Sequence, residues 1–171
     1  MQIRKLALLL STLCAAGAAL ADITVGVSVS ATGPAASLGI PEKNTFALLP
    51  QSIAGEKVKW IVLDDATDPT AGVKNVRKMI SEDKADVLIA ATATPVSMAI
   101  LEVAFETKTA QIAMAPVPPA GEKSAWIFST PQNFGLMATA IAEHMAASGV
   151  KSIGFIGYAD PYGELWLKAM Q

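Results

Sequence analysis

Residues 86–115 read DVLIAATATPVSMAILEVAFETKTAQIAMA, and the pattern of apolar residues in this segment determines the fold that we expect. A continuously apolar run, Val87–Ala90, comes first. An apolar pattern of helical period begins at Pro95, and a second short apolar run follows at Gln111–Ala115. A strand, a helix and a second strand of these lengths form a βαβ unit of a parallel sheet. Because the first run is apolar at every position, we expect helices on both faces of that sheet.

The same alternation of strands and helices continues over most of the chain. Short apolar runs predict strands at Ile23–Val29, Val58–Leu63, Asp86–Ala91, Gln111–Ala115 and Ser152–Ile156. Helices are predicted after Asp68-Pro69, from Pro95 onward, and over Phe134–Ala147 with Gly149 at its end. A further helix is predicted between Leu38 and Gly55, where Pro41 and Pro50 should shorten it. The expected fold class is therefore α/β, a parallel sheet flanked by helices.

The amino-terminal residues have the order of a secretory signal. Arg4 and Lys5 give a positively charged start, and an uncharged apolar run follows over Leu6–Leu13. Ala19 and Ala21 then place small residues where cleavage of a signal requires them. We expect cleavage after Ala21, because the apolar run is too short to span a bilayer.

The remaining composition limits the partners of the exported chain. The alternative export signal is a lipoprotein signal at Cys14, but Leu13 stands before it where a small residue is needed. Cys14 is the one cysteine, so the chain after Ala21 has no thiol for a disulfide or a metal site. Loss of Arg4 and Lys5 leaves eleven of the thirteen basic residues against fifteen acidic ones, and no basic patch suggests nucleic acid or anionic lipid. No later apolar run is long enough to cross a membrane.

The ligand site is expected at one edge of the sheet, because ligands of open parallel sheets bind beyond the carboxyl ends of the strands. This rule selects Ser30–Pro34, Asp64–Asp68, Thr92–Ser97, Ala115–Pro119 and Gly157–Tyr162. In Thr92–Ser97, hydroxyl side chains meet the free N–H groups of a helix start, which attract a carboxylate or phosphate. We predict Ser97 as the first ligand contact there and Thr94 as the second. The alternative is that Thr94 only caps the helix.

Other polar groups are better explained by local structure than by chemistry. Asp64, Asp65 and Asp68 suggest a metal or acid–base cluster, but no histidine or cysteine is near them in the sequence. Strand termination and helix capping are therefore the favoured interpretation. His144 is the only histidine, and no nucleophile elbow accompanies it. The sequence also has neither the glycine-rich phosphate loop nor the dinucleotide-binding fingerprint. We predict no catalytic residue, no metal site and no cofactor.

A series of short motifs runs through the chain in a recognisable order. They are Asp22–Val27, Thr32-Gly33-Pro34, Gly39, Asp64-Asp65, Asp68-Pro69, Val73, Val87–Ile89, Ala115-Pro116, Ile153–Ile156 and Asp160–Glu164. Together, in this order and spacing, they resemble the periplasmic leucine/isoleucine/valine-binding proteins of ABC transporters over nearly the whole chain after Ala21. The resemblance implies two α/β lobes with a solute held between them. Because members of the family are considerably longer, it also implies that this chain is truncated.

The resemblance further implies how the chain is divided and where its ligand contacts lie. It implies a signal over residues 1–21, a first lobe over residues 22–131 and the start of a second lobe over residues 132–171, with the crossing near Ser129–Asn133. It maps ligand contacts to Val96 and Ser97 at the helix start, Val117 in the following loop, Tyr162 in the second lobe and Leu38 at the side-chain pocket. Pro118 and Pro119 beside Val117 have no N–H to offer a ligand.

These observations predict a binding protein rather than an enzyme. We expect a periplasmic substrate-binding protein that captures a branched-chain-like amino acid or similar small carboxylate and presents it to an ABC transporter permease. Closure of the two lobes would be its only mechanism. A ligand-sensing receptor of the same fold is the first alternative, because an export signal fits both roles. An exported α/β enzyme is the second, which the lack of a nucleophile, base or metal cluster disfavours.

Overall fold

The computed structural model describes residues 22–118 and 121–171, so the predicted signal over residues 1–21 lies outside the described part. The strands are β1 (Ile23–Val29), β2 (Ser52–Ile53), β3 (Glu56–Asp64), β4 (Val87–Ala90), β5 (Ala110–Ala113) and β6 (Ile127–Ser129). The helices are α2 (Ala36–Phe46), α3 (Pro69–Ser81), α4 (Thr94–Thr107), the 3-10 helix η1 (Gly121–Trp126), α5 (Phe134–Ala147) and α6 (Pro161–Met170).

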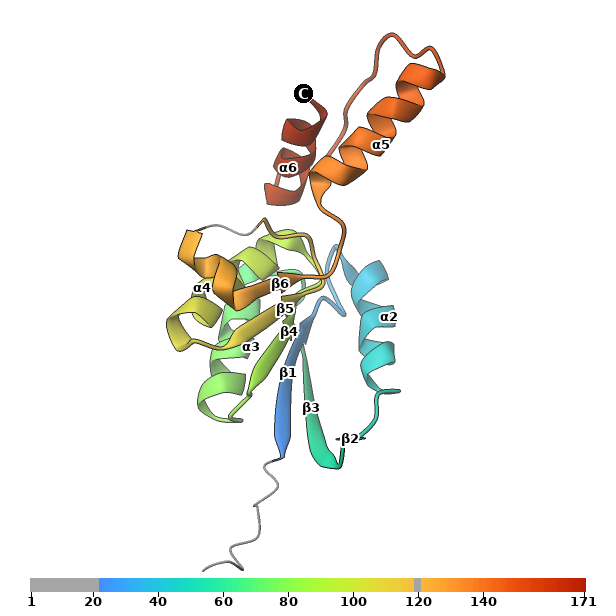
Figure 1. Cartoon of the computed structure of the whole chain (residues 1–171). Coiled ribbons are helices and arrows are strands. Elements are labelled where there is room, and N and C mark those ends of the chain that lie inside the picture. Colours follow the sequence, from blue (N-terminus) through green and yellow to red (C-terminus); the bar gives the residue numbers. More distant parts are fainter. Residues whose placement is uncertain (1–21, 119–120) are drawn as a thin grey trace, which may run out of the picture.

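The strands form one six-stranded sheet in the order β2-β3-β1-β4-β5-β6. β1 lies inside the sheet and runs parallel to β3 and β4, and β5 and β6 continue the parallel part. Among the described strands only β2 is antiparallel to its neighbour, β3. The parallel strands therefore end at the same edge of the sheet (Figure 1), which is the edge where ligands bind in such folds. The predicted α/β fold with a parallel sheet is confirmed.

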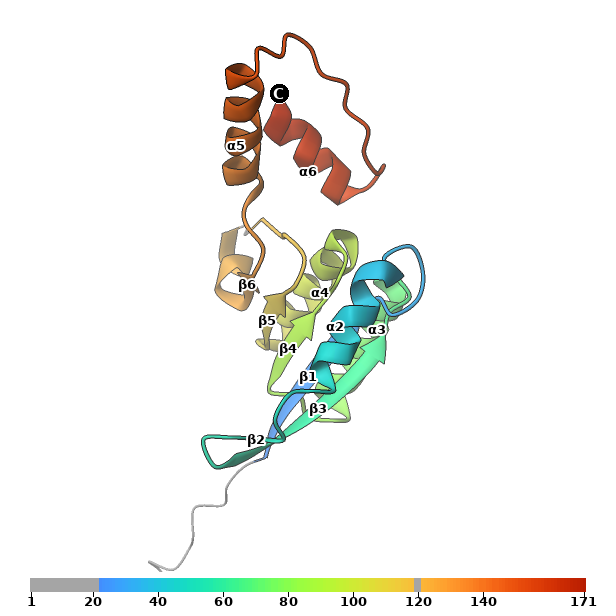
Figure 2. The same ribbon diagram turned by 90° about the vertical axis from the view of Figure 1, so that its right-hand side faces the viewer.

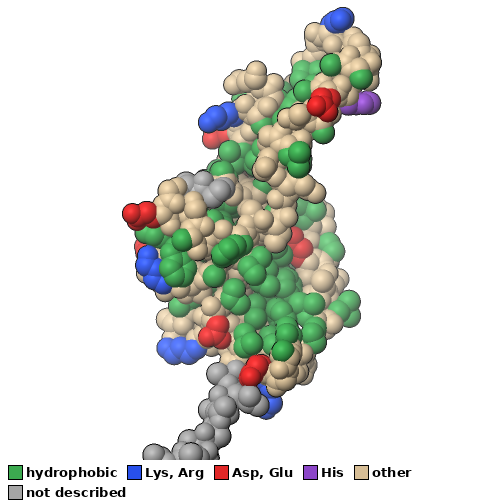
Figure 3. All heavy atoms as spheres, in the orientation of Figure 1, with side chains coloured by type: hydrophobic (Ala, Val, Ile, Leu, Met, Phe, Trp, Pro, Cys, Tyr) green, Lys and Arg blue, Asp and Glu red, His purple; other side chains and the backbone are tan. Residues whose placement is uncertain are grey.

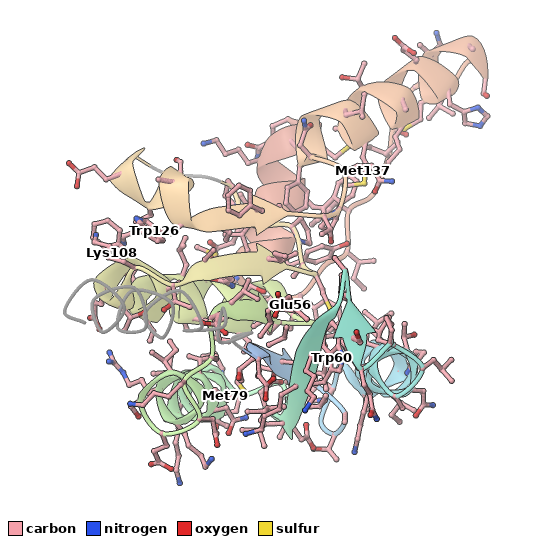
Figure 4. All side chains as sticks on the ribbon, turned by 60° about the horizontal axis from the view of Figure 1, so that its bottom comes forward. Glu56, Trp60, Met79, Lys108, Trp126 and Met137 are labelled. Atoms are coloured by element: carbon pink, nitrogen blue, oxygen red, sulfur yellow. The ribbon has the colours of Figure 1, made fainter. Side chains whose placement is uncertain are left out.

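Helices pack on both faces of the sheet, as the continuously apolar strands predict. α3 and α4 cover one face, where Met79, Leu88 and Ile100 are fully buried. α2 lies on the opposite face, where the rings of Phe46 and Trp60 are 6.0 Å apart. Figure 1 shows α2 and α3 on opposite sides of the strands, α2 faces the viewer in front of the sheet in Figure 2, and Figure 4 shows Trp60 and Met79 on opposite sides of the strands. α2 leaves part of this face of the sheet uncovered, and Figure 3 shows apolar side chains gathered there.

Side chains at the helix starts explain where three of the helices begin. The Asp68 carboxylate accepts a hydrogen bond from a backbone N–H of the first turn of α3 at 2.8 Å, and Pro69 is the first helical residue, as predicted. Asn133 and Asp160 cap α5 and α6 in the same way. α5 has the predicted range, and Gly149 follows it with φ of 71°. In the described residues, no helix is both long enough and apolar enough to span a membrane.

The helix α2 is longer than the sequence predicts. It passes through Pro41, which was expected to shorten it, and ends at Phe46. Pro41 removes only one donor, its own N–H, from the hydrogen bonds of the helix, so the residues after it still donate to carbonyl groups of the preceding turn. Pro50 lies beyond the helix, as expected.

The prediction of a strand at Ser152–Ile156 is wrong, since residues 151–158 have no regular secondary structure. An extended apolar segment becomes a strand only when another backbone pairs with it, and no described segment pairs with this one. The sequence analysis also missed β2 and β6. Their lengths of 2 and 3 residues are too short to show a hydrophobic period.

Candidate functional site

A buried aspartate joins β1 to the loop after β3 at the carboxyl edge of the sheet. The hydroxyl groups of Ser28 and Ser30 donate to the Asp65 carboxylate at 2.8 and 2.6 Å. The Thr67 N–H donates to the same carboxylate at 3.0 Å. Asp65 is fully buried, so these donors replace the hydration that its charge loses on folding. The arrangement gives Asp65 a structural role at the end of β3.

The two neighbouring aspartates also have local roles. Thr32 donates to Asp64 through its hydroxyl at 2.7 Å and its N–H at 3.2 Å, and the Ala66 N–H donates at 2.8 Å. Burial alone would raise the pKa of Asp64, but these hydrogen bonds hold that pKa below its usual value. Asp68 caps α3. The geometry therefore agrees with strand termination and capping, and no three potential metal ligands form a group within the described ranges.

The buried side chain of Ser97 forms hydrogen bonds with the backbone of the loop between β4 and α4. Its hydroxyl accepts a hydrogen bond from the Ala91 N–H at 2.7 Å and donates to the Ala91 carbonyl at 3.0 Å. The Gln111 amide donates to the carbonyls of Ala90 at 2.7 Å and Ser97 at 3.0 Å. Ser97 is 0% exposed and its hydroxyl is used within the protein. A ligand contact through Ser97 stays a prediction, and the structure adds a role in shaping the loop.

Thr94 does not cap its helix. The N-cap residue of α4 is Ala93, which has no side-chain capping hydrogen bond. The Thr94 hydroxyl instead donates to the Pro116 carbonyl at 3.1 Å, and Thr94 is only 2% exposed. Val96 is fully buried in the core between α3 and α4. The first intrahelical hydrogen bond of α4 runs from the Ser97 N–H to the Ala93 carbonyl, so the earlier N–H groups have no partner within the helix.

The loop after β5 lies next to this helix start. Val117 is buried, and its N–H donates to the Ser129 hydroxyl of β6 at 3.0 Å. The Thr94 bond to Pro116 links this loop to α4, so the structure brings Thr94, Val96, Ser97 and Val117 to one region. A hollow of about 640 Å³ opens beside it, lined among others by Val117, Pro118, Ser129, Phe134, Leu165 and Lys168.

The remaining predicted contacts, Leu38 and Tyr162, come from other elements. Leu38 lies in the first turn of α2 and is 60% exposed. Tyr162 lies in α6, half-buried, with its ring 5.7 Å from that of Phe134 in an edge-on packing. Figure 1 shows α5 and α6 beyond the carboxyl edge of the sheet. Leu38 and Tyr162 thus come from α2 and α6 and not from α4 or the loop after β5, and their role as ligand contacts stays a prediction.

Sequence reasoning missed one acidic residue at this edge. The Glu42 carboxylate of α2 accepts a hydrogen bond from the Thr92 hydroxyl at 2.5 Å, and that hydroxyl accepts one from the Ser30 N–H at 2.9 Å. Glu42 is half-buried, and this burial is the main reason why its pKa is raised. The hydrogen bond from Thr92 acts in the opposite direction and lowers the pKa, whereas the nearby negative charge of Asp65 raises it further. Had the helix been continued through Pro41, Glu42 would have fallen on the same face as Leu38.

A larger hollow lies away from this region. It has a volume of about 860 Å³ and lies between α2 and β3, lined among others by Lys43, Phe46, Lys57, Trp60 and Val62. The larger size does not make it the better candidate, because it lies along the face of the sheet and not at the carboxyl edge. The described polar network is centred on that edge, in Ser30, Asp65 and Thr92.

Known proteins share this fold and part of this sequence. A family profile described as "Periplasmic binding protein" matches residues 22–171. An extracellular ligand-binding receptor from Rhodopseudomonas palustris is 46% identical over 87% of the chain, with a TM-score of 0.85. A solute-binding protein of an ABC transporter from Rhodopseudomonas palustris BisB5, solved in complex with 3,4-dihydroxybenzoic acid, is 26% identical over 87% of the chain, with a TM-score of 0.78.

A leucine-binding protein from Thermotoga maritima MSB8 shares the fold, with a TM-score of 0.75 and 18% identity over 86% of the chain. All three solved proteins are longer. The chain spans 42% of the first two and 44% of the third. No match was found among the curated proteins.

Proposed function

Because the chain belongs to the periplasmic binding protein family, we propose that it acts in the solute-binding component of an ABC transporter. The proposed solute is a branched-chain-like amino acid or a similar small carboxylate. The family match over residues 22–171 carries this proposal. Two relatives support the choice of solute, since one was solved with 3,4-dihydroxybenzoic acid and another is a leucine-binding protein. The proposed action is capture between two closing lobes, without chemistry.

The proposed lobes follow the chain as the resemblance implies. Residues 22–131 form the first lobe, and residues 132–171 begin the second. β6 ends at Ser129 and α5 starts at Phe134, which supports a crossing near Ser129–Asn133. The solute would lie between the carboxyl edge of the first lobe and the second lobe.

The proposed position of the solute carboxylate is the start of α4. No side chain caps this helix, so the N–H groups of Thr94 and Val96 are the donors that a carboxylate would meet first. Pro95 between them has no N–H. Val117, Leu38 and Tyr162 are the proposed walls of the site, and Ser97 is kept as a proposed contact.

We further propose export to the periplasm with cleavage after Ala21, and delivery of the solute to a membrane permease. The description of the family supports the compartment. The signal itself lies in residues 1–21, outside the described part of the chain.

A thermal-shift screen of small carboxylates, followed by calorimetry, tests the proposal. A ligand that binds only the folded state, present at about 100 times its Kd, stabilises the protein by about 2.7 kcal/mol. We expect at least one carboxylate to raise the unfolding temperature and to bind with one ligand per chain. A preference for neutral sugars or for metal cations over every carboxylate would contradict the proposal.

A sensory role is the second candidate, because the 46% identical relative is described as an extracellular ligand-binding receptor. Uptake of the radiolabelled solute by cells with and without the gene separates the two roles. Loss of uptake on deletion supports transport. Unchanged uptake with a changed transcriptional response to the solute supports sensing. Turnover of carboxylate esters or amides by the purified protein would instead favour the exported-enzyme alternative.

A further inference from the structure

Glu42 is held at the carboxyl edge of the sheet by a directional chain of hydrogen bonds. The Ser30 N–H can only donate, so the Thr92 oxygen accepts from it at 2.9 Å. The Thr92 hydroxyl proton is then free to point to the Glu42 carboxylate at 2.5 Å. The chain of bonds starts on β1, passes through the loop after β4 and ends on α2. Glu42 is therefore the terminal acceptor of a network that spans three elements of the candidate site.

The helix that carries Glu42 is fixed close to the end of β1. A Cβ atom added to Gly39 would lie 2.1 Å from the Ser30 carbonyl oxygen, so only a glycine permits this approach. Leu38 and Glu42 are one helical turn apart and lie on the same face of α2. Glu42 thus lies beside the proposed pocket residue Leu38 and above the loop that leads to α4.

The Glu42 carboxylate has acceptor capacity that the described residues do not use. An ionised carboxylate has about four acceptor positions, and Thr92 occupies one. None of the ion pairs within the described residues includes Glu42. Its side chain is only half-buried, and its second oxygen is not among the fully enclosed polar atoms that lack a partner, so that oxygen is at least partly accessible to solvent or a ligand. A half-buried carboxylate of this kind favours a ligand group that donates a hydrogen bond.

We propose that Glu42 is a specificity-determining residue, whose carboxylate accepts a hydrogen bond from an ammonium or hydroxyl group of the solute. This inference rests on the proposed function, because it assumes that a small carboxylate binds at the start of α4. A solute with both groups satisfies α4 through its carboxylate and Glu42 through its donor. A carboxylate without a donor leaves Glu42 unsatisfied and adds a second negative charge near it, so the site selects against such a solute.

Two matched pairs of ligands test the inference by calorimetry on the full-length protein. L-leucine is compared with 4-methylpentanoate, which lacks the ammonium group, and 4-hydroxybenzoate is compared with benzoate, which lacks the hydroxyl. The first pair reports an ammonium donor and the second a phenolic donor. The test variant is Glu42→Gln, which keeps the size of the side chain and an acceptor for Thr92. The control is Glu143→Gln, which removes the same charge from an exposed position on α5.

We expect the wild type to prefer the donor-bearing member of at least one pair by about tenfold or more. In Glu42→Gln that preference falls to within about twofold of equal affinity, through weaker binding of the donor-bearing member, and in Glu143→Gln it is unchanged. Any one of three results would overturn the inference but leave the proposed function standing. These are an unchanged preference in Glu42→Gln, an equal loss of affinity for both members of a pair in that variant, and no preference in the wild type. Absence of binding for all four compounds would overturn the proposed function and the inference with it.

Discussion

Replacement of Ser97 by alanine separates a structural role from a ligand contact. The Ser97 hydroxyl is fully buried and makes two hydrogen bonds to the backbone of Ala91. Ser97→Ala leaves the buried Ala91 N–H and carbonyl without this partner. An unsatisfied buried polar group costs about 1–3 kcal/mol, so we expect a loss of about 2 kcal/mol in the free energy of unfolding. For a protein of this size that loss lowers the midpoint of thermal unfolding by about 4–8 °C.

The measurement is thermal unfolding followed by circular dichroism, without ligand, supported by urea unfolding. The control is Ser37→Ala, because Ser37 is exposed on α2 and a surface substitution of this kind changes stability by no more than about 0.5 kcal/mol. The sequence alone predicts the opposite behaviour, a loss of affinity by about ten- to a hundredfold with an almost unchanged melting temperature. A Ser97→Ala midpoint within about 1 °C of the wild type would refute the argument from burial.

Three further predictions follow from other parts of the molecule. Gly72→Ala should cost about 1–3 kcal/mol in urea unfolding, because the new Cβ would lie 2.5 Å from Val96 Cγ1 and push α3 from α4; an unchanged midpoint contradicts this. The pKa of Glu42 is raised on folding, so the folded state is favoured below pH 4.5 and loses that contribution as the pH rises through the folded pKa. Glu42→Gln should therefore be more stable than the wild type at pH 7, with a difference that shrinks as the pH falls through the folded pKa toward the ordinary value of 4.5, and a difference constant with pH would exclude this origin. Amide hydrogens of residues 132–171 should exchange faster than those of residues 23–115, since residues 151–158 are exposed and have no regular structure; equal rates would argue against a separate second lobe.

Local patterns predicted most of the first part of the fold. The range of β1 and the range of α5 agree with the structure, because a short β-branched run and a long helical period are each visible within one segment. Asp68 and Pro69 identified the start of α3 for the same reason, since a cap acts on its own first turn. The prediction of a strand at Ser152–Ile156 was wrong because strand formation depends on a pairing partner elsewhere in the chain.

The candidate site was predicted less well than the fold. The edge of the sheet follows from the order of strands and helices, so the region around Thr94 and Val117 could be found from the sequence. Whether a hydroxyl faces a ligand or the interior depends on distant contacts. The Thr94 hydroxyl donates a hydrogen bond to the Pro116 carbonyl. The Glu42 carboxylate accepts one from Thr92, a residue 50 positions further along the sequence. No local pattern contains these pairings.

Amide hydrogen exchange with and without a saturating carboxylate tests the central claim most directly. The ligand is L-leucine or 4-hydroxybenzoate, whichever binds more tightly in calorimetry. We predict that it slows exchange most in residues 92–97, where the N–H groups of Thr94 and Val96 begin α4. Protection confined to the hollow between α2 and β3, around Lys43 and Trp60, or no protection by any bound carboxylate, would contradict a binding site at the carboxyl edge of the sheet.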